Sequence, residues 1–187
     1  MARTVTPALF FEAAMTTLAG PGLPALRIGR LCAALGVTSG SFYHHFGSWE
    51  GFVRALLDHW AREESERVVA MVAERSDPDE RVVLLKHLAL ALPHDAETAI
   101  RRWAGTDTLV AEAQERVDEG RRRTLRQVLA PVVGEALAVT LSEVGMSILV
   151  GHQQLHGHGP VVDLGPQLDQ FELLVRTHAG TPVSGGA

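Results

Sequence analysis

Residues 27–46 (RIGRLCAALGVTSGSFYHHF) hold the densest set of side chains whose chemistry suits contact with a nucleic acid. A short amphipathic helix is predicted to end at Gly36, where a left-handed residue turns the chain, and Thr38 is predicted to cap the next helix. The second helix offers hydroxyl, phenol and imidazole groups for hydrogen bonds to phosphates or base edges, and small residues that permit close approach. We therefore predict a helix-turn-helix whose DNA contacts are Arg27, Arg30, Thr38, Ser39, Gly40, Ser41, Tyr43 and His44.

Histidines raise the question of a metal site at two places. His152, His156 and His158 follow one another closely, and an i, i+4 pair can share a metal ion on one helix face. No Cys or acidic ligand accompanies them in this stretch, so a solvated or interfacial cluster is favoured over a metal site. His44 and His45 are consecutive and point apart on a helix, so His45 is predicted to pack inside and His44 to face outward.

The sequence contains no recognisable catalytic set. It has no Ser/His/Asp group with an elbow motif, no phosphate loop and no paired catalytic carboxylates, so neither an enzyme nor a cofactor is expected. Cys32 falls on the apolar stripe of a predicted helix and is interpreted as a core residue. Because it is the only cysteine, an internal disulfide and a cysteine-rich zinc module are excluded.

Trp60, His87 and Trp103 are the residues that we expect nearest to a small-molecule pocket. His87, with Lys86, interrupts the otherwise apolar run VVLLKHLALAL (residues 82–92), and a polar break in a buried helix is typical of a pocket wall. The alternative for all three residues is ordinary packing in the core.

The elements that must position these residues are all predicted to be helices. Apolar residues recur at spacings of three and four throughout, and no alternating strand pattern occurs. Helices are predicted to begin at the caps Thr6, Asp77 and Asp107, and one is predicted to open at Pro131. Because residues 82–92 are apolar nearly all round, their helix is predicted to be central and buried. The fold class is therefore all-α, with about nine helices.

The last two predicted helices carry more apolar residues than a small core needs. One stripe is Val133, Leu137, Leu141, Val144 and Ile148, and the other is Leu164, Leu168, Phe171 and Val175. We expect part of this surface to pair with a second copy of the chain in a four-helix seam. Gly145 and Gly151 would suit the close approach of another helix there.

Composition and charge exclude several classes of protein. A chain of 187 residues suits one compact domain, or a small module joined to a medium one. No apolar run reaches the ~18 residues that span a bilayer, and no secretion signal is recognised, so we expect a cytoplasmic protein without membrane contact. The net charge is −5, but residues 1–60 carry +1, so the front is weakly basic. Because only 5% of residues are aromatic, aliphatic side chains are expected to fill the core.

The stretch LGVTSGSFYHHFGSWE (residues 35–50) resembles the tetracycline-repressor (TetR) family of transcriptional regulators. The family signature Gly-Val-Ser-x-Gly-x-(aliphatic or aromatic)-Tyr-x-His-Phe is matched at Gly36, Val37, Gly40, Tyr43, His45 and Phe46, with Thr38 as the equivalent cap. The resemblance implies a DNA-binding domain at 1–46 and a domain at 47–187 that binds a small-molecule effector and dimerises through the last two helices. It further implies a homodimeric repressor on a palindromic operator with half-sites about 34–36 Å apart or a multiple of it.

Three departures from the family pattern bear on DNA binding. Arg27 stands where the second helix usually has a Ser or Thr cap, Gly29 where a polar phosphate contact is common, and Trp49 where a Lys is usual. The predicted recognition helix carries no Arg or Lys, so DNA binding is predicted to be weak and sensitive to salt. The alternative is a protein of the same fold that binds a small molecule or a partner and has lost DNA recognition.

Overall fold

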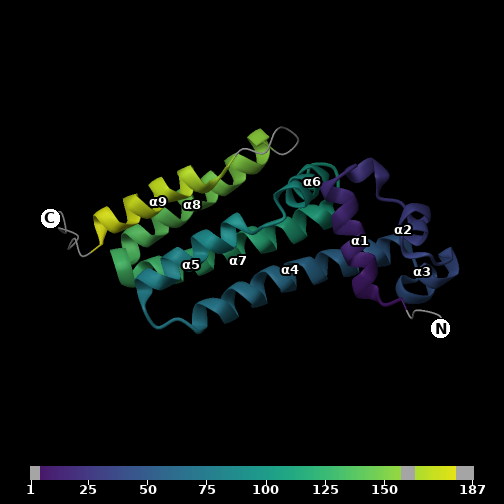
Figure 1. Cartoon of the computed structure of the whole chain (residues 1–187), viewed down its shortest axis with the longest axis horizontal. Coiled ribbons are helices and arrows are strands. Elements are labelled where there is room, and N and C mark those ends of the chain that lie inside the picture. Colours follow the sequence, from purple (N-terminus) through teal and green to yellow (C-terminus); the bar gives the residue numbers. More distant parts are fainter. Residues whose placement is uncertain (1–4, 157–162, 180–187) are drawn as a thin grey trace. The chain divides into compact units, whose positions relative to one another are not determined.

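Every regular element in the described part of the chain is helical, as the sequence predicted. The computed structural model describes residues 5–156 and 163–179, and Figure 1 shows their order along the chain. The elements are α1 (Pro7–Ala19), the 3₁₀ helix η1 (Leu23–Ala25), α2 (Ile28–Leu35), α3 (Ser39–Phe46), α4 (Trp49–Ala73), α5 (Pro78–Leu90), α6 (His94–Ala104), α7 (Thr108–Val133), α8 (Glu135–His156) and α9 (Gly165–His178). None of these helices is long and apolar enough to cross a bilayer.

The chain forms two compact units, each made of two stretches of sequence. The first combines the described residues of Met1–Glu63 with Pro93–Glu115, and the second combines Glu64–Leu92 with the described residues of Arg116–Ala187. The helix-turn-helix module predicted at 1–46 therefore lies inside the first unit, which also includes α6. The long helices α4 and α7 each contribute residues to both units.

Local capping signals account for most of the helix boundaries. The Asp77 carboxylate accepts a hydrogen bond from the Asp79 N–H at 2.8 Å, and the Asp107 carboxylate accepts one from the Leu109 N–H at 3.0 Å, so both predicted caps are confirmed. Thr6 is at the N-cap position of α1, but its side chain makes no capping hydrogen bond.

The predicted start of a helix at Pro131 is wrong. Pro131 lies inside the last turn of α7, and the helix ends instead before Gly134, whose φ is +82°. A left-handed residue breaks a helix more sharply than a proline near its end, since only a few hydrogen bonds remain there for the proline to interrupt. The Gly134 carbonyl then accepts the first hydrogen bond of the next helix, from the Ala138 N–H at 3.0 Å.

Aromatic rings, and not aliphatic side chains alone, fill the core around the helix-turn-helix. The Phe10 ring lies 5.7 Å from that of Phe42 and 5.4 Å from that of Phe46, while Phe52 lies 5.2 Å from Phe42. Phe10, Phe42 and Phe52 are completely buried. The expectation of an aliphatic core is thus wrong for this module, because five of the six phenylalanines of the chain fall within residues 10–52. Cys32 is buried, as predicted.

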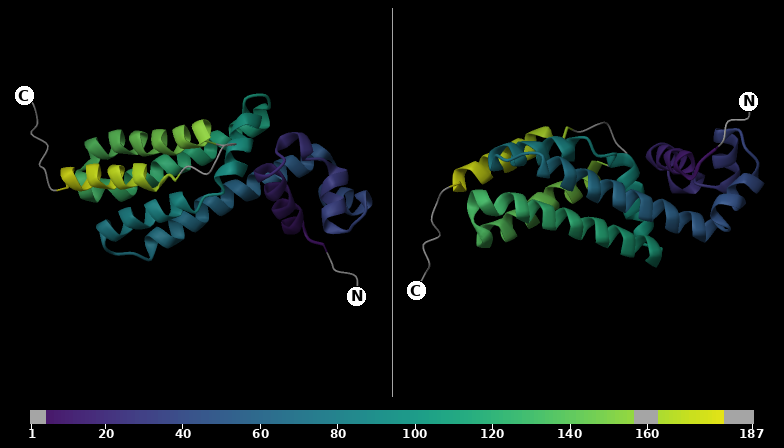
Figure 2. Two further views of the ribbon diagram at one scale, coloured as in Figure 1. Left: turned by 45° about the horizontal axis from the view of Figure 1, so that its top comes forward. Right: turned by 90° about the horizontal axis from the view of Figure 1, so that it is seen from below.

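The second unit is a bundle in which α9 packs against both α5 and α8 (Figures 1 and 2). Most residues of the two apolar stripes that were predicted to form the dimer contact are buried in the core of this bundle. The buried residues are Val133, Leu141, Leu164, Leu168, Phe171 and Val175. Gly145 also serves this internal packing, since a Cβ there would lie 3.1 Å from the Phe171 ring, whereas a Cβ on Gly151 would meet open space.

Helix α5 is not the central, buried helix that its apolar sequence predicted. Only Val82 and Leu88 of this helix are buried, and His87 and Leu90 are exposed. The helix packs one face against the bundle, so periodicity alone overestimated its burial.

Candidate functional site

The turn between α2 and α3 has the geometry of a helix-turn-helix. Gly36 lies in the left-handed region (φ 68°, ψ 32°), as predicted. Its N–H donates to the Ala33 carbonyl at 3.2 Å, and the Val37 N–H donates to the Cys32 carbonyl at 3.0 Å, so the last carbonyls of α2 are satisfied as the chain turns. Thr38 then occupies the N-cap position of α3 without a side-chain capping bond.

Helix α3 has one buried and one exposed face. Phe42 is completely buried, and His45 Nε2 lies 2.9 Å from the Val5 carbonyl oxygen, so His45 packs inward as predicted. Tyr43 and His44 are exposed, with 51% of the Tyr43 surface accessible. Of the remaining predicted contacts on this segment, Thr38, Ser39 and Gly40 are exposed and Ser41 is half-buried. The hydrogen-bonding groups that the sequence singled out are therefore gathered on the outer side of α3.

The start of α2 presents two exposed cations. Arg27, Gly29 and Arg30 are exposed and line a shallow depression together with residues of the preceding η1 region. Arg27 occupies the N-cap position without a capping bond, and its Nε donates to the Pro24 carbonyl at 2.9 Å. This bond holds Arg27 at the turn and leaves its terminal nitrogens at an exposed position.

Trp49, the third departure from the family pattern, has a structural role. Its ring stacks on Phe42 at 6.5 Å with an interplanar angle of 20°, and lies 5.4 Å from Phe52. Because Phe42 belongs to α3 and Phe52 to α4, the indole fills the corner between these helices. A positive charge is lost at position 49 relative to the family pattern, and aromatic packing is gained.

The histidine pair of α8 does not form part of a metal cluster in the described residues. The rings of His152 and His156 lie 5.3 Å apart, and His158 lies outside the described part of the chain. No group of three or more His, Cys, Asp or Glu side chains arranged to hold a metal ion occurs in residues 5–156 and 163–179.

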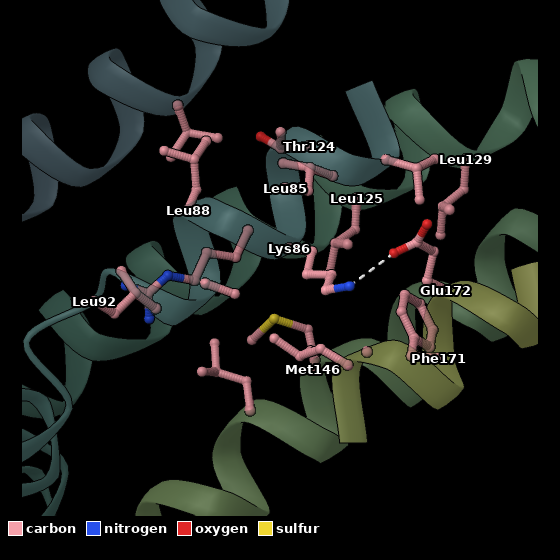
Figure 3. Close-up of a pocket in the computed structure, with 17 residues that line it drawn as sticks. Leu85, Lys86, Leu88, Leu92, Thr124, Leu125, Leu129, Met146, Phe171 and Glu172 are labelled. Atoms are coloured by element: carbon pink, nitrogen blue, oxygen red, sulfur yellow. Dashed lines mark hydrogen bonds and ion pairs between the residues drawn. The ribbon is translucent and has the colours of Figure 1, made fainter. Parts of the chain in front are cut away.

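A cavity of about 100 Å³ lies inside the second unit (Figure 3). Its wall is contributed by α4, α5, α7, α8 and α9 and is mainly aliphatic, with Met146 and Phe171 among the larger side chains. The polar members of the wall are Lys86, Arg121, Thr124 and Glu172. A mainly apolar cavity with a few polar groups is the usual form of a small-molecule site.

None of the three residues expected near a pocket lines this cavity. Trp60 and Trp103 are buried in the first unit, and His87 is exposed and lines a separate, shallow depression on the second unit. Of the two polar residues that interrupt the apolar run of α5, Lys86 lines the cavity and His87 does not. The sequence held a signal for this residue, since Lys86 is the only lysine in the chain.

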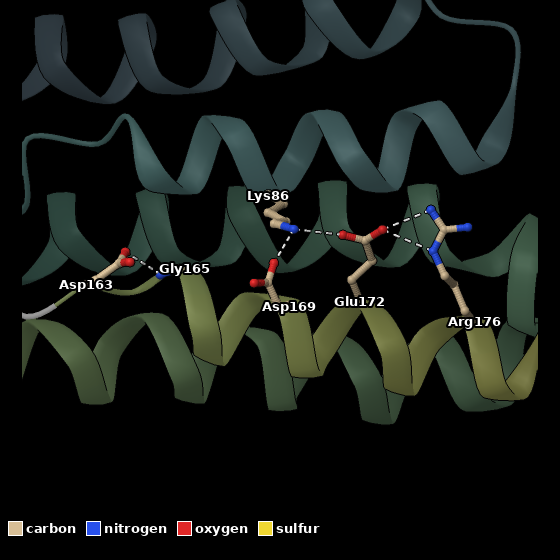
Figure 4. A network of polar contacts seen from close by, with 6 residues as sticks. All are labelled: Lys86, Asp163, Gly165, Asp169, Glu172 and Arg176. Atoms are coloured by element: carbon tan, nitrogen blue, oxygen red, sulfur yellow. Dashed lines mark hydrogen bonds and ion pairs between the residues drawn. The ribbon is translucent and has the colours of Figure 1, made fainter.

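Lys86 belongs to an ion-pair network between α5 and α9 (Figure 4). Its Nζ pairs with Asp169 and donates to Glu172 Oε2 at 3.0 Å, while Arg176 donates to Glu172 Oε1 from Nε at 3.0 Å and from Nη2 at 2.8 Å. The hydrogen bonds to Asp169 and Glu172 raise the pKa of Lys86. The hydrogen bonds from Lys86 and Arg176 lower the pKa of Glu172. Both shifts favour the charged forms of Lys86 and Glu172 at neutral pH.

The sequence comparison matches the start of the chain to a known family. Residues 10–56 match the family described as bacterial regulatory proteins, tetR family. No curated protein matches the chain. The matched range includes α2, α3 and the turn between them, so the site on the outer side of α3 lies within it.

Solved structures share the fold over nearly the whole chain. A transcriptional regulator from Rhodococcus sp. Rha1 is 20% identical, with a TM-score of 0.76 over 95% of this chain and 100% of that one. A TetR transcriptional regulator from Legionella pneumophila is 15% identical, with a TM-score of 0.74 over 96% and 100% of the two chains. NemR of E. coli in its reduced form is 15% identical, with a TM-score of 0.71 over 96% and 100%.

Proposed function

We propose that the chain is a DNA-binding transcriptional regulator of the TetR family and that it acts as a homodimeric repressor; the family match over residues 10–56 supports this proposal. In this proposal it binds a palindromic operator and releases it when a small molecule occupies the cavity of the second unit. The observation that carries the proposal is the division of α3 into a buried aromatic face and an exposed polar face.

The proposed DNA contacts follow from this division. The exposed side of α3 lies in the major groove, where His44 and Ser41 read base edges and the Tyr43 hydroxyl donates to a phosphate. Thr38, Ser39 and Gly40 come closest to the backbone at the start of α3, where the helix N–H groups favour a phosphate. Since α3 has no Arg or Lys, Arg27 and Arg30 of α2 supply the neutralisation of phosphates.

The proposed dimer uses apolar side chains that the bundle does not bury. Leu173 and Leu174 of α9 and Val139 and Leu155 of α8 are exposed, with 79% of the Leu155 surface accessible. Exposed leucines on two neighbouring helices suit an isologous four-helix contact with a second copy. Two-fold symmetry would then set the spacing of the two recognition helices.

The proposed response to an effector needs two states that bind it differently. The cavity wall includes Val68 of α4, and α4 is one continuous helix that begins beside α3 at Trp49. A ligand that repacks the wall would therefore bias the position of a helix that is covalently joined to the DNA-binding module.

Selection of bound fragments from genomic DNA by the full-length protein tests the DNA-binding part. We expect a palindromic sequence with half-sites about 34–36 Å apart. On that sequence, Arg30→Ala should reduce the slope of log affinity against log salt by about one. Arg54→Ala is the matched control, because Arg54 is an exposed arginine of the same unit that pairs with Glu50. Failure to enrich any fragment at low salt would overturn the proposal.

Sedimentation of the protein tests the dimer. The wild type should sediment at about twice the 20.2 kDa of one chain, and Leu173→Glu should shift it toward the monomer. Val69→Glu is the control, because Val69 is a similarly exposed apolar residue on α4. A wild-type monomer at micromolar concentration would contradict the proposed assembly.

A further inference from the structure

The polar end of the cavity is built around Lys86, whose acceptors among the described residues leave one of its three N–H donors for a ligand or for water. An ammonium group has three N–H donors, and among the described residues Lys86 Nζ contacts two acceptors, Asp169 and Glu172. The lysine side chain lines the cavity and is only 22% exposed. Figure 3 shows its amine directed toward Glu172, with aliphatic side chains of α5 and α7 around it.

We propose that the cavity binds a small uncharged molecule with an apolar body and one hydrogen-bond acceptor, which accepts its hydrogen bond from Lys86 Nζ. This inference rests on the proposed effector function and specifies the chemical class of the effector. Simple ketones, esters and alcohols with a compact hydrocarbon part belong to this class.

The size of the ligand follows from the cavity. Its volume of about 100 Å³ is smaller than the roughly 150 Å³ of an apolar cavity that holds benzene. A compact body of a few carbon atoms therefore fits without rearrangement of the wall. Leu85, Leu125 and Met146 offer that body only aliphatic and thioether surface.

The charge of the ligand follows from the network around Lys86. The cations Lys86 and Arg176 are balanced by the carboxylates of Asp169 and Glu172. A carboxylate ligand would place a third negative charge beside two others in a largely apolar space, and a cation would meet the ammonium of Lys86. Arg121, the other cation of the wall, is already engaged in an interaction of its own.

The two carboxylate partners of Lys86 disfavour covalent capture of a carbonyl compound. Its two carboxylate partners raise its pKa, so the amine stays an ammonium at neutral pH and has no free electron pair to attack a carbonyl carbon. Lys86 is thus a hydrogen-bond donor toward the ligand and not a nucleophile.

Four probes share a five-membered ring and differ in their polar group: cyclopentane, cyclopentanone, cyclopentanecarboxylate and cyclopentylammonium. Their affinities distinguish the contribution of the apolar ring from that of the charge. Binding is followed on full-length protein by NMR of ¹³C-labelled methionine methyl groups, because Met146 lines the cavity and Met15 lies in the other unit. We expect saturable shifts of Met146, and not of Met15, with cyclopentane and cyclopentanone. Cyclopentylammonium, which has as many heavy atoms as cyclopentanone, should bind at least about tenfold more weakly than the ketone, and the larger carboxylate should not bind more tightly than the ketone. A carboxylate that binds more tightly than the ketone would overturn the proposal.

Lys86→Met tests the hydrogen bond, since it keeps the length of the side chain and removes the donor. The affinity for cyclopentanone should fall about tenfold or more, which is the usual size of a hydrogen bond from a charged donor. The affinity for cyclopentane should stay the same and shows that the cavity is intact. Equal loss for both probes would refute a role for the donor. If this variant does not fold, the ranking of the four probes on the wild type still decides the chemical class.

These measurements need no DNA, so they separate the ligand class from the proposed function. Ketone binding at Met146 without any change in operator affinity would leave the ligand class standing and refute effector control. Tight binding of the carboxylate, with operator binding intact, would refute the ligand class alone.

Discussion

The turn of the helix-turn-helix offers a matched pair of glycine substitutions. Gly29 and Gly36 lie seven residues apart at the two ends of α2, and a Cβ placed on either would have nothing within 4 Å. They differ in backbone conformation, since Gly36 has a φ of +68° and Gly29 is in the first turn of a right-handed helix. Any difference between Gly36→Ala and Gly29→Ala therefore reports the left-handed turn and not steric crowding.

The expected magnitudes have opposite signs. An alanine in the left-handed conformation costs about 1–2 kcal/mol, so Gly36→Ala should destabilise the protein by that amount. Glycine in a helix costs about 1 kcal/mol relative to alanine, so Gly29→Ala should stabilise it by up to that amount. For a chain of this length 1 kcal/mol corresponds to about 2–4 °C. The two variants should thus melt about 2–12 °C apart.

Thermal denaturation at one fixed protein concentration measures this difference. Gly36→Asn provides an intermediate control, because asparagine tolerates the left-handed region better than alanine does. Gly36→Ala should also weaken operator binding, since it disturbs the entry of α3, while Gly29→Ala should leave it unchanged. If Gly36→Ala melts with the wild type, Gly36 is not held in the left-handed conformation and the described turn is wrong.

Three further perturbations test other parts of the structure. Asp77→Ala and Asp107→Ala should each cost about 1 kcal/mol of unfolding free energy in urea titrations, since each removes a side-chain cap; Asp79→Ala is the control. The unfolding free energy should fall in acid as Glu172 becomes protonated, because the pKa of Glu172 lies below its ordinary value of 4.5. It should also fall above pH 10.5, where Lys86 loses its proton. Urea titrations at several pH values measure both decreases in the unfolding free energy, and Lys86→Met should remove the decrease in alkali. His44→Ala should change which operator base is preferred by about 1–3 kcal/mol, seen in titrations of single-base operator variants, whereas Tyr43→Phe should weaken all variants alike.

Whether stability is lost in acid or in alkali follows from the direction in which folding shifts each pKa. A carboxylate stabilised by Lys86 and Arg176 has a lower pKa in the folded than in the unfolded state, so its contribution is present above the unfolded pKa and is lost as the pH falls. The raised pKa of Lys86 gives the reverse, with a contribution that is present below the unfolded pKa and is lost as the pH rises. An unfolding free energy that is flat from pH 3 to pH 8 would contradict the Glu172 contacts.

The sequence by itself determined the features that depend on a few consecutive residues. The helical class, the turn at Gly36, the caps Asp77 and Asp107, and the opposite orientations of His44 and His45 all agree with the structure. Each depends on backbone conformation or on a hydrogen bond within four residues, and such interactions are encoded locally. The helix-turn-helix is readable for the same reason, because its turn and both its helices lie within 20 residues.

Only the tertiary structure decided where the cavity lies and which apolar side chains of the last two helices remain exposed. Lys86 and Glu172 meet across 86 residues of sequence, and no periodicity in α5 tells which of Lys86 and His87 will face the cavity. The stripes of the last two helices looked available for a partner, yet Phe171 packs on Gly145 inside the same bundle, and the exposed residues are instead Val139, Leu155, Leu173 and Leu174. A helical pattern gives the direction of a side chain relative to its own helix. What lies in that direction depends on how distant helices pack.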